Sequence, residues 1–170
     1  RAHETRKAPP APAVDPQRCG PSRSPARSPP ENKSQDLKLI EVRSLAVEAV
    51  KVIRFARFRD ARGYFTEHFR RGDFHGQAEL GFLKGVEFLQ ANESFSRPGT
   101  IRGLHFQWNP YMGKLLRTVS GRMVDMFLDI RKGSPTYGKI ALYEMPADIA
   151  AAHDGWIWVP PGSAPGNYFV

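Results

Sequence analysis

The sequence predicts an all-β domain, either a sandwich or a barrel, on three observations. Short apolar stretches recur from about residue 37 to residue 170, and turns that contain Gly and Pro separate them. This spacing is typical of antiparallel sheets joined by short connections. Residues 122–131 alternate between two faces, as the residues of a strand do. After residue 80, no stretch has the apolar period of a helix of several turns.

A segment of different composition, residues 1–36, precedes this domain. It is rich in Pro, Arg and Ser, and eight of the fifteen prolines fall in its first thirty residues. Such a segment buries too little apolar surface to offset its chain entropy, so we expect a disordered tail. All 11 Phe, 5 Tyr and 3 Trp lie at or after residue 55, so we place one domain at residues 37–170.

The first elements of the domain mix strands with a short helix. Residues 37–58 ("LKLIEVRSLAVEAVKVIRFARF") have enough apolar side chains for a strand or a short helix that leads into the domain. Residues 60–69 ("DARGYFTEHF") place an Arg-Gly pair before the start of an aromatic strand. Residues 74–82 ("FHGQAELGF") predict a loop followed by a short helix.

Residues 85–96 ("GVEFLQANESFS") alternate in the manner of a strand. One face begins apolar and turns polar along the chain. We therefore expect a strand that enters the mouth of a cavity. That face consists of Val86, Phe88, Gln90 and Asn92.

Residues 99–110 ("GTIRGLHFQWNP") read as a short apolar strand that nevertheless carries Arg102, His105 and Gln107. Burying such a group without a partner costs about 1–3 kcal/mol. These side chains therefore face solvent, satisfy one another or line a cavity. Arg102 and His105 are three residues apart, so a regular strand points them to opposite faces. Gly103 between them permits a bulge that brings both to one side.

Residues 114–131 ("KLLRTVSGRMVDMFLDIR") predict two strands around a turn at Ser120-Gly121. In the second strand one face is apolar and the other is mixed. We expect the charged members of the mixed face to form a structural polar network and not a catalytic set. The apolar face consists of Val124, Met126, Leu128 and Ile130, and the mixed face of Asp125, Phe127, Asp129 and Arg131.

The last predicted elements follow a turn that contains both Gly and Pro, "KGSPTYG" at residues 132–138. Residues 139–145 ("KIALYEM") predict another strand. Residues 155–162 ("GWIWVPPG") end one more.

Charge and cysteine content restrict the class of protein. The net charge is +8, and part of it lies in residues 1–38. A basic chain can bind nucleic acid, but no lysine-rich run or aromatic-interleaved motif supports that, so we expect a solvated surface and no nucleic-acid partner. Cys19 is the only cysteine, so no intrachain disulfide forms and the fold needs no oxidising compartment. No apolar run is long enough to span a bilayer or to act as a secretory signal, so we expect a cytoplasmic protein without a membrane partner.

Four motifs in order carry a family resemblance: "DARGYFTEHF", "FLQANESFSRPGTIRGLHFQ", "GKLLRTVSGRMVDMFLDIRKGSPTYGK" and "WIWVPPGSAPG". Over residues 52–170 the chain resembles the dTDP-4-dehydrorhamnose 3,5-epimerase family. The family segments R-G-L-H-[YF]-Q and D-[LI]-R-x-G-S-P-T-[YF]-G are long and rarely matched by chance. The resemblance implies a jelly-roll fold of the cupin-like group.

The resemblance also implies a reaction. The family acts on a 4-keto-6-deoxy sugar attached to thymidine diphosphate. The ketone at C4 acidifies the protons on C3 and C5, a base removes each of them through an enolate, and a proton returns on the opposite face. The family's base is the histidine of the R-G-L-H motif, which maps onto His105. Imidazole suits this role because its unperturbed pKa lies near the working pH. The lysine that stabilises the enolate oxygen maps onto Lys114.

Further positions match family residues that hold the nucleotide sugar. Arg102 would meet the diphosphate, since the arginine fork suits phosphate oxygens. The resemblance implies no metal and no cofactor, a dTDP-4-keto-6-deoxy sugar as substrate, a role in deoxysugar or L-rhamnose biosynthesis, and a homodimer. The other matched binding positions are Arg62, Glu67, Gln90 and Asn92.

The sequence departs from the family in two places. Where the family has P-x-G-F-A-H-G-F, this chain has "PPGSAPGNYF", with Ser163, Pro165 and Asn167 at the altered positions. Family members also continue for some dozens of residues and carry there a tyrosine acid and an aspartate that orients the base. We therefore expect a jelly roll incomplete at its C-terminus, weak binding of dTDP or a dTDP-sugar, and little or no full 3,5-epimerisation.

Two other readings stay open at this point. A metal-dependent cupin would need several His or carboxylate ligands, and "LHFQW" offers one histidine while Pro165 occupies a later ligand position. A non-catalytic sugar-nucleotide-binding or degenerate jelly roll is the stronger alternative, because both departures favour it. The exact sugar, and whether one or both carbons react, are not determined by these residues.

Overall fold

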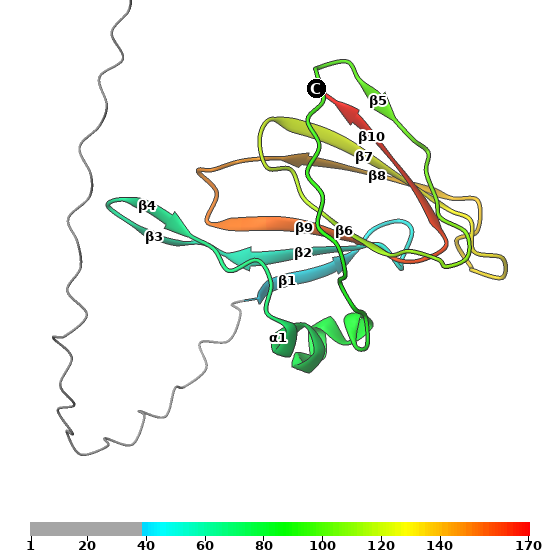
Figure 1. The fold of residues 1–170 in the computed structure, drawn as a ribbon, viewed down its shortest axis with the longest axis horizontal. Coiled ribbons are helices and arrows are strands. Elements are labelled where there is room, and N and C mark those ends of the chain that lie inside the picture. Colours follow the sequence, from blue (N-terminus) through cyan, green and yellow to red (C-terminus); the bar gives the residue numbers. More distant parts are fainter. Residues whose placement is uncertain (1–38) are drawn as a thin grey trace, which may run out of the picture. The chain divides into compact units, whose positions relative to one another are not determined.

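The computed structural model describes residues 39–170, and within them it contains two four-stranded antiparallel sheets that face each other (Figure 1). The expected disorder of residues 1–36, and the start of the domain at residue 37, lie outside the described part. None of the helices within residues 39–170 is long and apolar enough to cross a membrane. The first sheet has the order β1 (Leu39–Ser44), β2 (Lys51–Ala56), β9 (His153–Val159), β6 (Lys114–Leu116), and the second has β5 (Ile101–Arg102), β10 (Ser163–Phe169), β7 (Arg122–Asp129), β8 (Ile140–Pro146).

The inner faces of the two sheets enclose an apolar core. Side chains from β2 and β9 of the first sheet pack against side chains from β7 and β8 of the second. Burial of each such side chain contributes about 1.5–3 kcal/mol. This sandwich of antiparallel sheets confirms the predicted all-β jelly-roll class. The core consists of Val47, Val50, Val52, Met123, Phe127, Ala141, Met145, Ile157 and Val159.

Strand β7 presents its mixed face to this core, and its apolar face is the less buried one. Met123, Asp125, Phe127 and Asp129 are buried, whereas the residues between them are half-buried. The two aspartates are tolerated inside because each has a hydrogen-bond donor beside it. The outer face of the second sheet is therefore apolar and exposed, as at Leu142, where 63% of the surface is accessible.

The opposite face of the first sheet is covered by a short helical segment. Helix α1 (Arg71–Gly76) and a 3₁₀ helix (Ala78–Leu83) confirm the loop and short helix expected there. Phe74, Leu80 and Leu83 are buried against Ile53, Phe55 and Trp158. The rings of Phe55 and Phe74 stack with their centroids 6.0 Å apart. This second cluster buries the outer face of the first sheet, while the inner face of that sheet packs against the second sheet.

A two-stranded hairpin, β3 (Phe58–Asp60) and β4 (Gly63–Phe65), projects beyond the first sheet (Figure 1). Its register pairs Phe58 with Phe65 and Asp60 with Gly63. Every residue of its two strands is exposed. The aromatic strand predicted after Arg-Gly is thus present, but it pairs only with its own neighbour.

The strand expected at residues 85–96 does not form. The alternation is reflected in packing, since Phe88 contacts Phe74 and Trp158 with ring centroids 5.9 and 6.2 Å apart. Yet no backbone hydrogen bond joins residues 87–96 to another backbone segment within the described part of the chain. Alternation encodes which side chains are buried, whereas a strand also requires a free neighbouring edge, which depends on the tertiary fold.

Candidate active site

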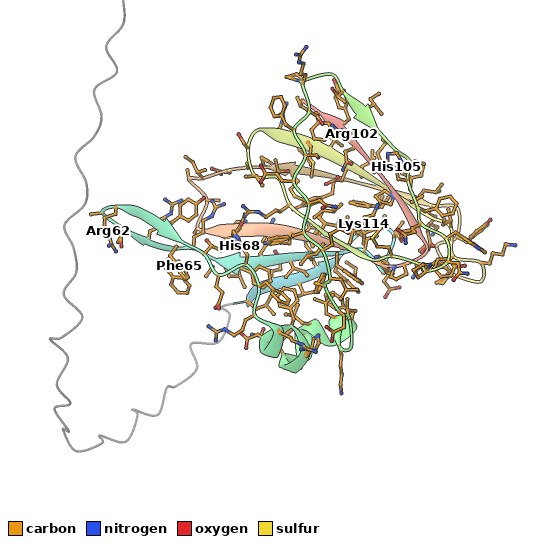
Figure 2. The ribbon with its side chains drawn as sticks, viewed as in Figure 1. Arg62, Phe65, His68, Arg102, His105 and Lys114 are labelled. Atoms are coloured by element: carbon orange, nitrogen blue, oxygen red, sulfur yellow. The ribbon has the colours of Figure 1, made fainter. Side chains whose placement is uncertain are left out.

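The segment after β5 shows how Arg102 and His105 reach one side of a sheet (Figure 2). Arg102 pairs with Asn167 of β10, so a regular ladder would place Leu104 opposite Pro165. Instead, the His105 amide donates to the Pro165 carbonyl at 2.8 Å. One extra residue is therefore accommodated between Arg102 and His105, and His105 stands opposite Pro165. This is the bulge that Gly103 was expected to permit, and it limits the strand predicted at residues 99–110 to two residues.

Gly103 is required at this bulge for two physical reasons. Its φ of 105° lies in the region that side chains rarely adopt. A Cβ at this position would lie 2.6 Å from the Cα of Gly166 and 2.9 Å from the Pro165 carbonyl oxygen. The two glycines thus let the β5 and β10 backbones approach closely where the ladder breaks.

Pro165 fits this central strand because of the same irregularity. A proline inside a sheet normally removes a ladder hydrogen bond. In an antiparallel ladder the nitrogen and carbonyl of one residue point to the same neighbour. Since the Pro165 carbonyl points to His105, its nitrogen also faces that side and not β7, where Pro165 pairs with Phe127. The departure at Pro165 therefore leaves the β10–β7 pairing intact.

Arg102 and Lys114 point into the space between the sheets from opposite sides. Arg102, Asn167 and Asp125 form one cross-strand row on the inner face of the second sheet. Lys114 pairs with Val159 of the core, which sets Lys114 on the inner face of the first sheet. Lys114 is half-buried, and burial lowers the pKa of its ammonium group. Figure 2 shows Arg102, His105 and Lys114 on segments at the same side of the sandwich.

Arg102 is held by local contacts. Its Nε donates to Ser96 Oγ at 2.8 Å, and its Nη2 donates to the Phe95 carbonyl at 3.1 Å. Its guanidinium lies 6.0 Å from the centre of the Phe169 ring. The side chain remains exposed, so remaining N–H groups are free to meet an anion.

Asp125 and Asn167 belong to this row, although sequence analysis assigned neither to the site. Asn167 Nδ2 donates to Asp125 Oδ1 in a short contact, and the second carboxyl oxygen has no partner within the described residues. Burial raises the pKa of Asp125 to about 6, and the hydrogen bond from Asn167 opposes that rise. Asp129 and Arg131 form part of the expected polar network, whereas Asp125 bonds to Asn167 and not to either of them. One hint of this pair was present in the sequence, which is that Asn167 departs from the family motif. Asn167 can be recognised as the partner of Asp125 only when β10 is known to pair with β7.

Gln90 and Asn92 lie together on the unpaired segment that precedes Arg102. Gln90 Nε2 donates to Asn92 Oδ1 at 2.9 Å, and both side chains are exposed. Their alternation survives, but no strand fixes them. Their place in a cavity with His105 and Lys114 stays a prediction.

Arg62 and Glu67 lie elsewhere. Arg62 sits at the turn of the β3–β4 hairpin, where 90% of its side chain is exposed and its Nη2 lies 2.6 Å from Asp60 Oδ2. Glu67 accepts from Arg70 Nε and Nη2 at 2.9 Å each. Figure 2 shows Arg62 at the opposite end of the described region from Arg102 and His105. The structure thus brings together only part of the predicted set.

His105, Arg102 and Lys114, which we call the inner row, combine a base with two cations from the two sheets, and Asp125 adds a carboxyl. The His105 ring forms no hydrogen bond within residues 39–170, so both of its nitrogens are available to a ligand. Lys114 and Arg102 supply positive charge from the two sheets. Among the described residues, no three His, Cys, Asp or Glu side chains gather as a metal ion would need. The arrangement can remove a proton from a bound anion and stabilise the resulting negative charge.

Comparisons with known proteins agree with this fold and these motifs. The family model for dTDP-4-dehydrorhamnose 3,5-epimerase matches residues 44–170. A dTDP-4-dehydrorhamnose 3,5-epimerase of Sinorhizobium fredii is 42% identical over 125 residues, which cover 72% of this chain and 60% of that protein. One of Shigella flexneri is 42% identical over 110 residues, covering 64% of this chain and 56% of that protein.

Solved structures give the same result. A dTDP-6-deoxy-D-glucose-3,5-epimerase of Legionella pneumophila, in complex with dTDP-4-keto-L-rhamnose, has a TM-score of 0.66 and 30% identity, covering 76% of this chain and 65% of that one. A Bacillus anthracis dTDP-4-dehydrorhamnose 3,5-epimerase with TDP and PPi bound has a TM-score of 0.64 and 34% identity, covering 76% and 70%. The chain spans 60% or less of the length of the two curated relatives above. With a family model that matches most of its length, the chain belongs to the dTDP-4-dehydrorhamnose 3,5-epimerase family.

Proposed function

We propose that this protein epimerises a dTDP-4-keto-6-deoxy sugar in deoxysugar biosynthesis, such as that of L-rhamnose. The observation that carries the proposal is the bulge at Gly103, which turns His105 to the side of Arg102 in a chain of this family. Without that bulge, the base and the phosphate-binding cation would face opposite sides of a sheet.

Each residue of the inner row then has a role. The His105 imidazole removes the proton on C3 or C5, and the electron pair of that C–H bond moves toward the C4 ketone as an enolate. The Lys114 ammonium stabilises the negative enolate oxygen, and its half-buried position strengthens that interaction. A proton from solvent water then returns to the carbon on the opposite face, and the protonated His105 releases its proton to solvent, which restores both the water and the base. Arg102 binds the diphosphate with the N–H groups that Ser96 and Phe95 leave free.

Binding of the rest of the nucleotide sugar involves Gln90, Asn92, Arg62 and Glu67. Gln90 and Asn92 precede Arg102 on the same exposed segment. Arg62 is too far from Arg102 in one copy, so we propose a homodimer in which the β3–β4 hairpin of one copy serves the site of the other. The exposed outer face of the second sheet, with Ile101, Ile140 and Leu142 each more than half accessible, supports association.

The protein's location and its other partners remain at the level of expectation. We expect a cytoplasmic enzyme with neither a nucleic-acid nor a membrane partner. The reaction needs no added cofactor, since the ketone of the substrate acidifies the neighbouring C–H bonds itself.

A non-catalytic dTDP-sugar-binding protein is the second candidate. The observation that favours it is the Asn167–Asp125 contact beside Pro165, where the family motif has phenylalanine and histidine. That contact satisfies one oxygen of the buried Asp125 carboxyl but provides no second imidazole at this position.

Hydrogen exchange on the substrate separates the two candidates. The protein is mixed with a dTDP-4-keto-6-deoxy sugar in D₂O, and mass spectrometry measures deuterium at C3 and C5. An epimerase incorporates deuterium, and Lys114→Gln slows incorporation roughly 10²–10³-fold, as loss of one enolate-stabilising group does. Lys132→Gln, an exposed lysine in the β7–β8 turn, is the matched control and leaves the rate unchanged. A binding protein retains the sugar without exchange.

A further inference from the structure

A buried ionic cluster lies at the base of the β3–β4 hairpin, away from the inner row. It consists of Arg57, His68, Arg117 and Asp154, which we call the Asp154 cluster. Asp154 Oδ1 accepts from Arg57 Nη2 at 3.2 Å, and Oδ2 lies 2.9 Å from His68 Nε2 and in short contact with Arg117 Nη1. The side chains of Arg57 and Asp154 are only 5% and 8% exposed. One carboxylate thus contacts three nitrogen-bearing side chains from three separate chain segments.

Arg57 connects this cluster to the hairpin. It immediately precedes β3, and its guanidinium lies 4.5 Å from the centre of the Tyr64 ring on β4. Its Nη1 donates to the carbonyls of Asp148 and Ala151, and its amide donates to the Ala152 carbonyl at 3.0 Å. The Arg57 side chain therefore contacts both Tyr64 of the hairpin and the connection between β8 and β9.

Arg59 adds a second attachment on β3 itself. Its Nη2 donates to the Ala151 carbonyl at 3.0 Å and to the Ile149 carbonyl. Its guanidinium lies 5.7 Å from the Tyr64 ring centre. Beyond these contacts the hairpin strands are exposed and pair only with each other, so an isolated ribbon of this length is marginal on its own. Arg57 and Arg59 therefore attach the hairpin to the connection between β8 and β9.

The His68 side of the cluster contacts the irregular segment that leaves the hairpin, between β4 and α1. The His68 ring meets Trp156 edge-on at 5.6 Å, and Arg117 lies 5.4 Å from the centre of the same ring. Burial and Arg117 lower the pKa of His68, although Asp154 opposes that shift. With His68 neutral, Asp154 is the only counter-charge to Arg57 and Arg117 in the cluster. Removing it leaves two buried or half-buried guanidinium groups unpaired, which is costly.

We infer that Asp154 and Arg57 are positioning residues that aim the β3–β4 hairpin, and so Arg62, at the nucleotide-sugar site of a second copy. This inference rests on the proposed function, because Arg62 contributes to binding only if that site binds a dTDP-sugar. The two residues named here lie outside every matched motif of the site, since Arg57 precedes "DARGYFTEHF" and Asp154 precedes "WIWVPPGSAPG", whereas His68 and Arg117 lie within matched motifs. Its contacts nevertheless converge on the base of the one element that carries Arg62.

A double-mutant cycle with dTDP as the probe tests the inference. Isothermal titration calorimetry measures dTDP affinity for the full chain and for Arg62→Ala, Asp154→Asn and the double variant. Loss of a charge-assisted contact makes Arg62→Ala weaker by roughly tenfold. Asp154→Asn is expected to weaken binding by a similar factor, and the double variant by no more than either alone, because both lose the same interaction.

Two further measurements distinguish aiming from general stability. Hydrogen exchange of amides 57–65 is expected to rise at least tenfold in Asp154→Asn, while amides of β7 and β10 stay protected. Asp129→Asn, another buried carboxylate paired with an arginine, is the matched control and leaves both dTDP affinity and hairpin exchange unchanged. Arg59→Gln, at an exposed position, reproduces the hairpin effect if Asp154→Asn does not fold.

The outcomes separate the two proposals. If Arg62→Ala weakens dTDP binding but the cluster variants bind normally with protected hairpin amides, the positioning role is overturned and the proposed function stands. Additive losses in the double variant also overturn it. If the unaltered chain does not bind dTDP at all, the proposed function falls, and the inference falls with it whatever the hairpin amides show.

Discussion

Two aspartates on the inner face of β7, Asp125 and Asp129, stand four residues apart in opposite electrostatic surroundings. Asp129 accepts from Arg131 Nη2 at 2.7 Å and from Ser134 and Thr136 hydroxyls at 2.6 Å each. Among residues 39–170, the Asp125 carboxyl accepts a hydrogen bond from Asn167 alone. Hydrogen bonds, led by that from Arg131, hold the pKa of Asp129 well below its usual range, whereas burial raises the pKa of Asp125 to about 6.

This difference separates a structural end of the second sheet from a site end. Within the described residues, the hydrogen-bond donors to the Asp129 carboxylate all come from residues 131–136, so this carboxylate is satisfied by one turn of the chain. The partner of Asp125 is 42 residues away in the sequence, on the neighbouring strand β10, and the second oxygen of the Asp125 carboxyl has no hydrogen-bond partner within the described residues. A fully satisfied carboxylate stabilises a fold, and a partly satisfied one is what a ligand site retains.

Among the substitutions that test this difference, the largest loss of stability is expected at Asp129, at the structural end of the sheet. Asp129→Ala leaves Arg131, Ser134 and Thr136 without their acceptor, and removal of one partner of a buried ion pair costs about 3–5 kcal/mol. Urea denaturation monitored by tryptophan fluorescence measures this loss. A loss below about 1 kcal/mol would show that the turn at residues 131–136 does not depend on Asp129.

The pH dependence of stability is expected to have opposite signs at the two ends. The folded pKa of Asp125 is raised, so its contribution is present below pH 4 and is lost as pH rises toward about 6, by about 3 kcal/mol. The folded pKa of Asp129 is lowered, so its contribution is present above pH 4 and is lost on acidification.

Asp125→Asn separates these two effects. The amide keeps an acceptor for Asn167 and cannot ionise, so the variant is expected to be more stable than the unaltered chain at pH 8 and not at pH 4. Denaturation curves at both pH values measure the difference. Equal effects at both values would mean that Asp125 is already ionised without cost in the folded chain.

The smallest expected effect concerns binding and contrasts two arginines. Arg102→Lys keeps the charge but loses the planar fork, so dTDP affinity falls roughly tenfold. Arg131→Lys at the structural end lowers stability but leaves the affinity of the folded protein unchanged. Calorimetric titration with dTDP compares them, and equal losses of affinity in both variants would contradict the division of the sheet.

Much of the fold followed from the sequence because its cues are local. Alternation and turn residues predicted the strands of the sandwich, and the spacing of Arg102, Gly103 and His105 predicted a bulge. Packing between sheets is not local. The alternation of β7 could not show that its mixed face is the buried one. That outcome depends on the hydrogen-bond partners of Asp125 and Asp129, which the strand's own sequence does not reveal.

The parts of the site that sequence analysis missed depend on pairs far apart in the chain. Asn167 and Asp125 are 42 residues apart and meet only through the β10–β7 register. Arg57 and Asp154 are 97 apart and share no motif. Residues 85–96 illustrate the reverse case, since their alternation is reflected in packing but residues 87–96 pair with no sheet edge within the described chain. The separation of Arg62 from His105 could not be predicted either, because the order of motifs along the sequence does not determine their distance in the fold.

The central claim is that the bulge after β5 makes His105 the base of the inner row. Deuterium incorporation from D₂O into a dTDP-4-keto-6-deoxy sugar tests it most directly when the unaltered chain is compared with His105→Asn. His105→Asn is expected to abolish incorporation at C3 and C5 and to leave dTDP affinity within about threefold, because a base that acts on the sugar contributes little to holding the nucleotide. His153→Asn, on β9 of the first sheet, is the matched control and exchanges normally. Incorporation that continues unchanged in His105→Asn would contradict the account.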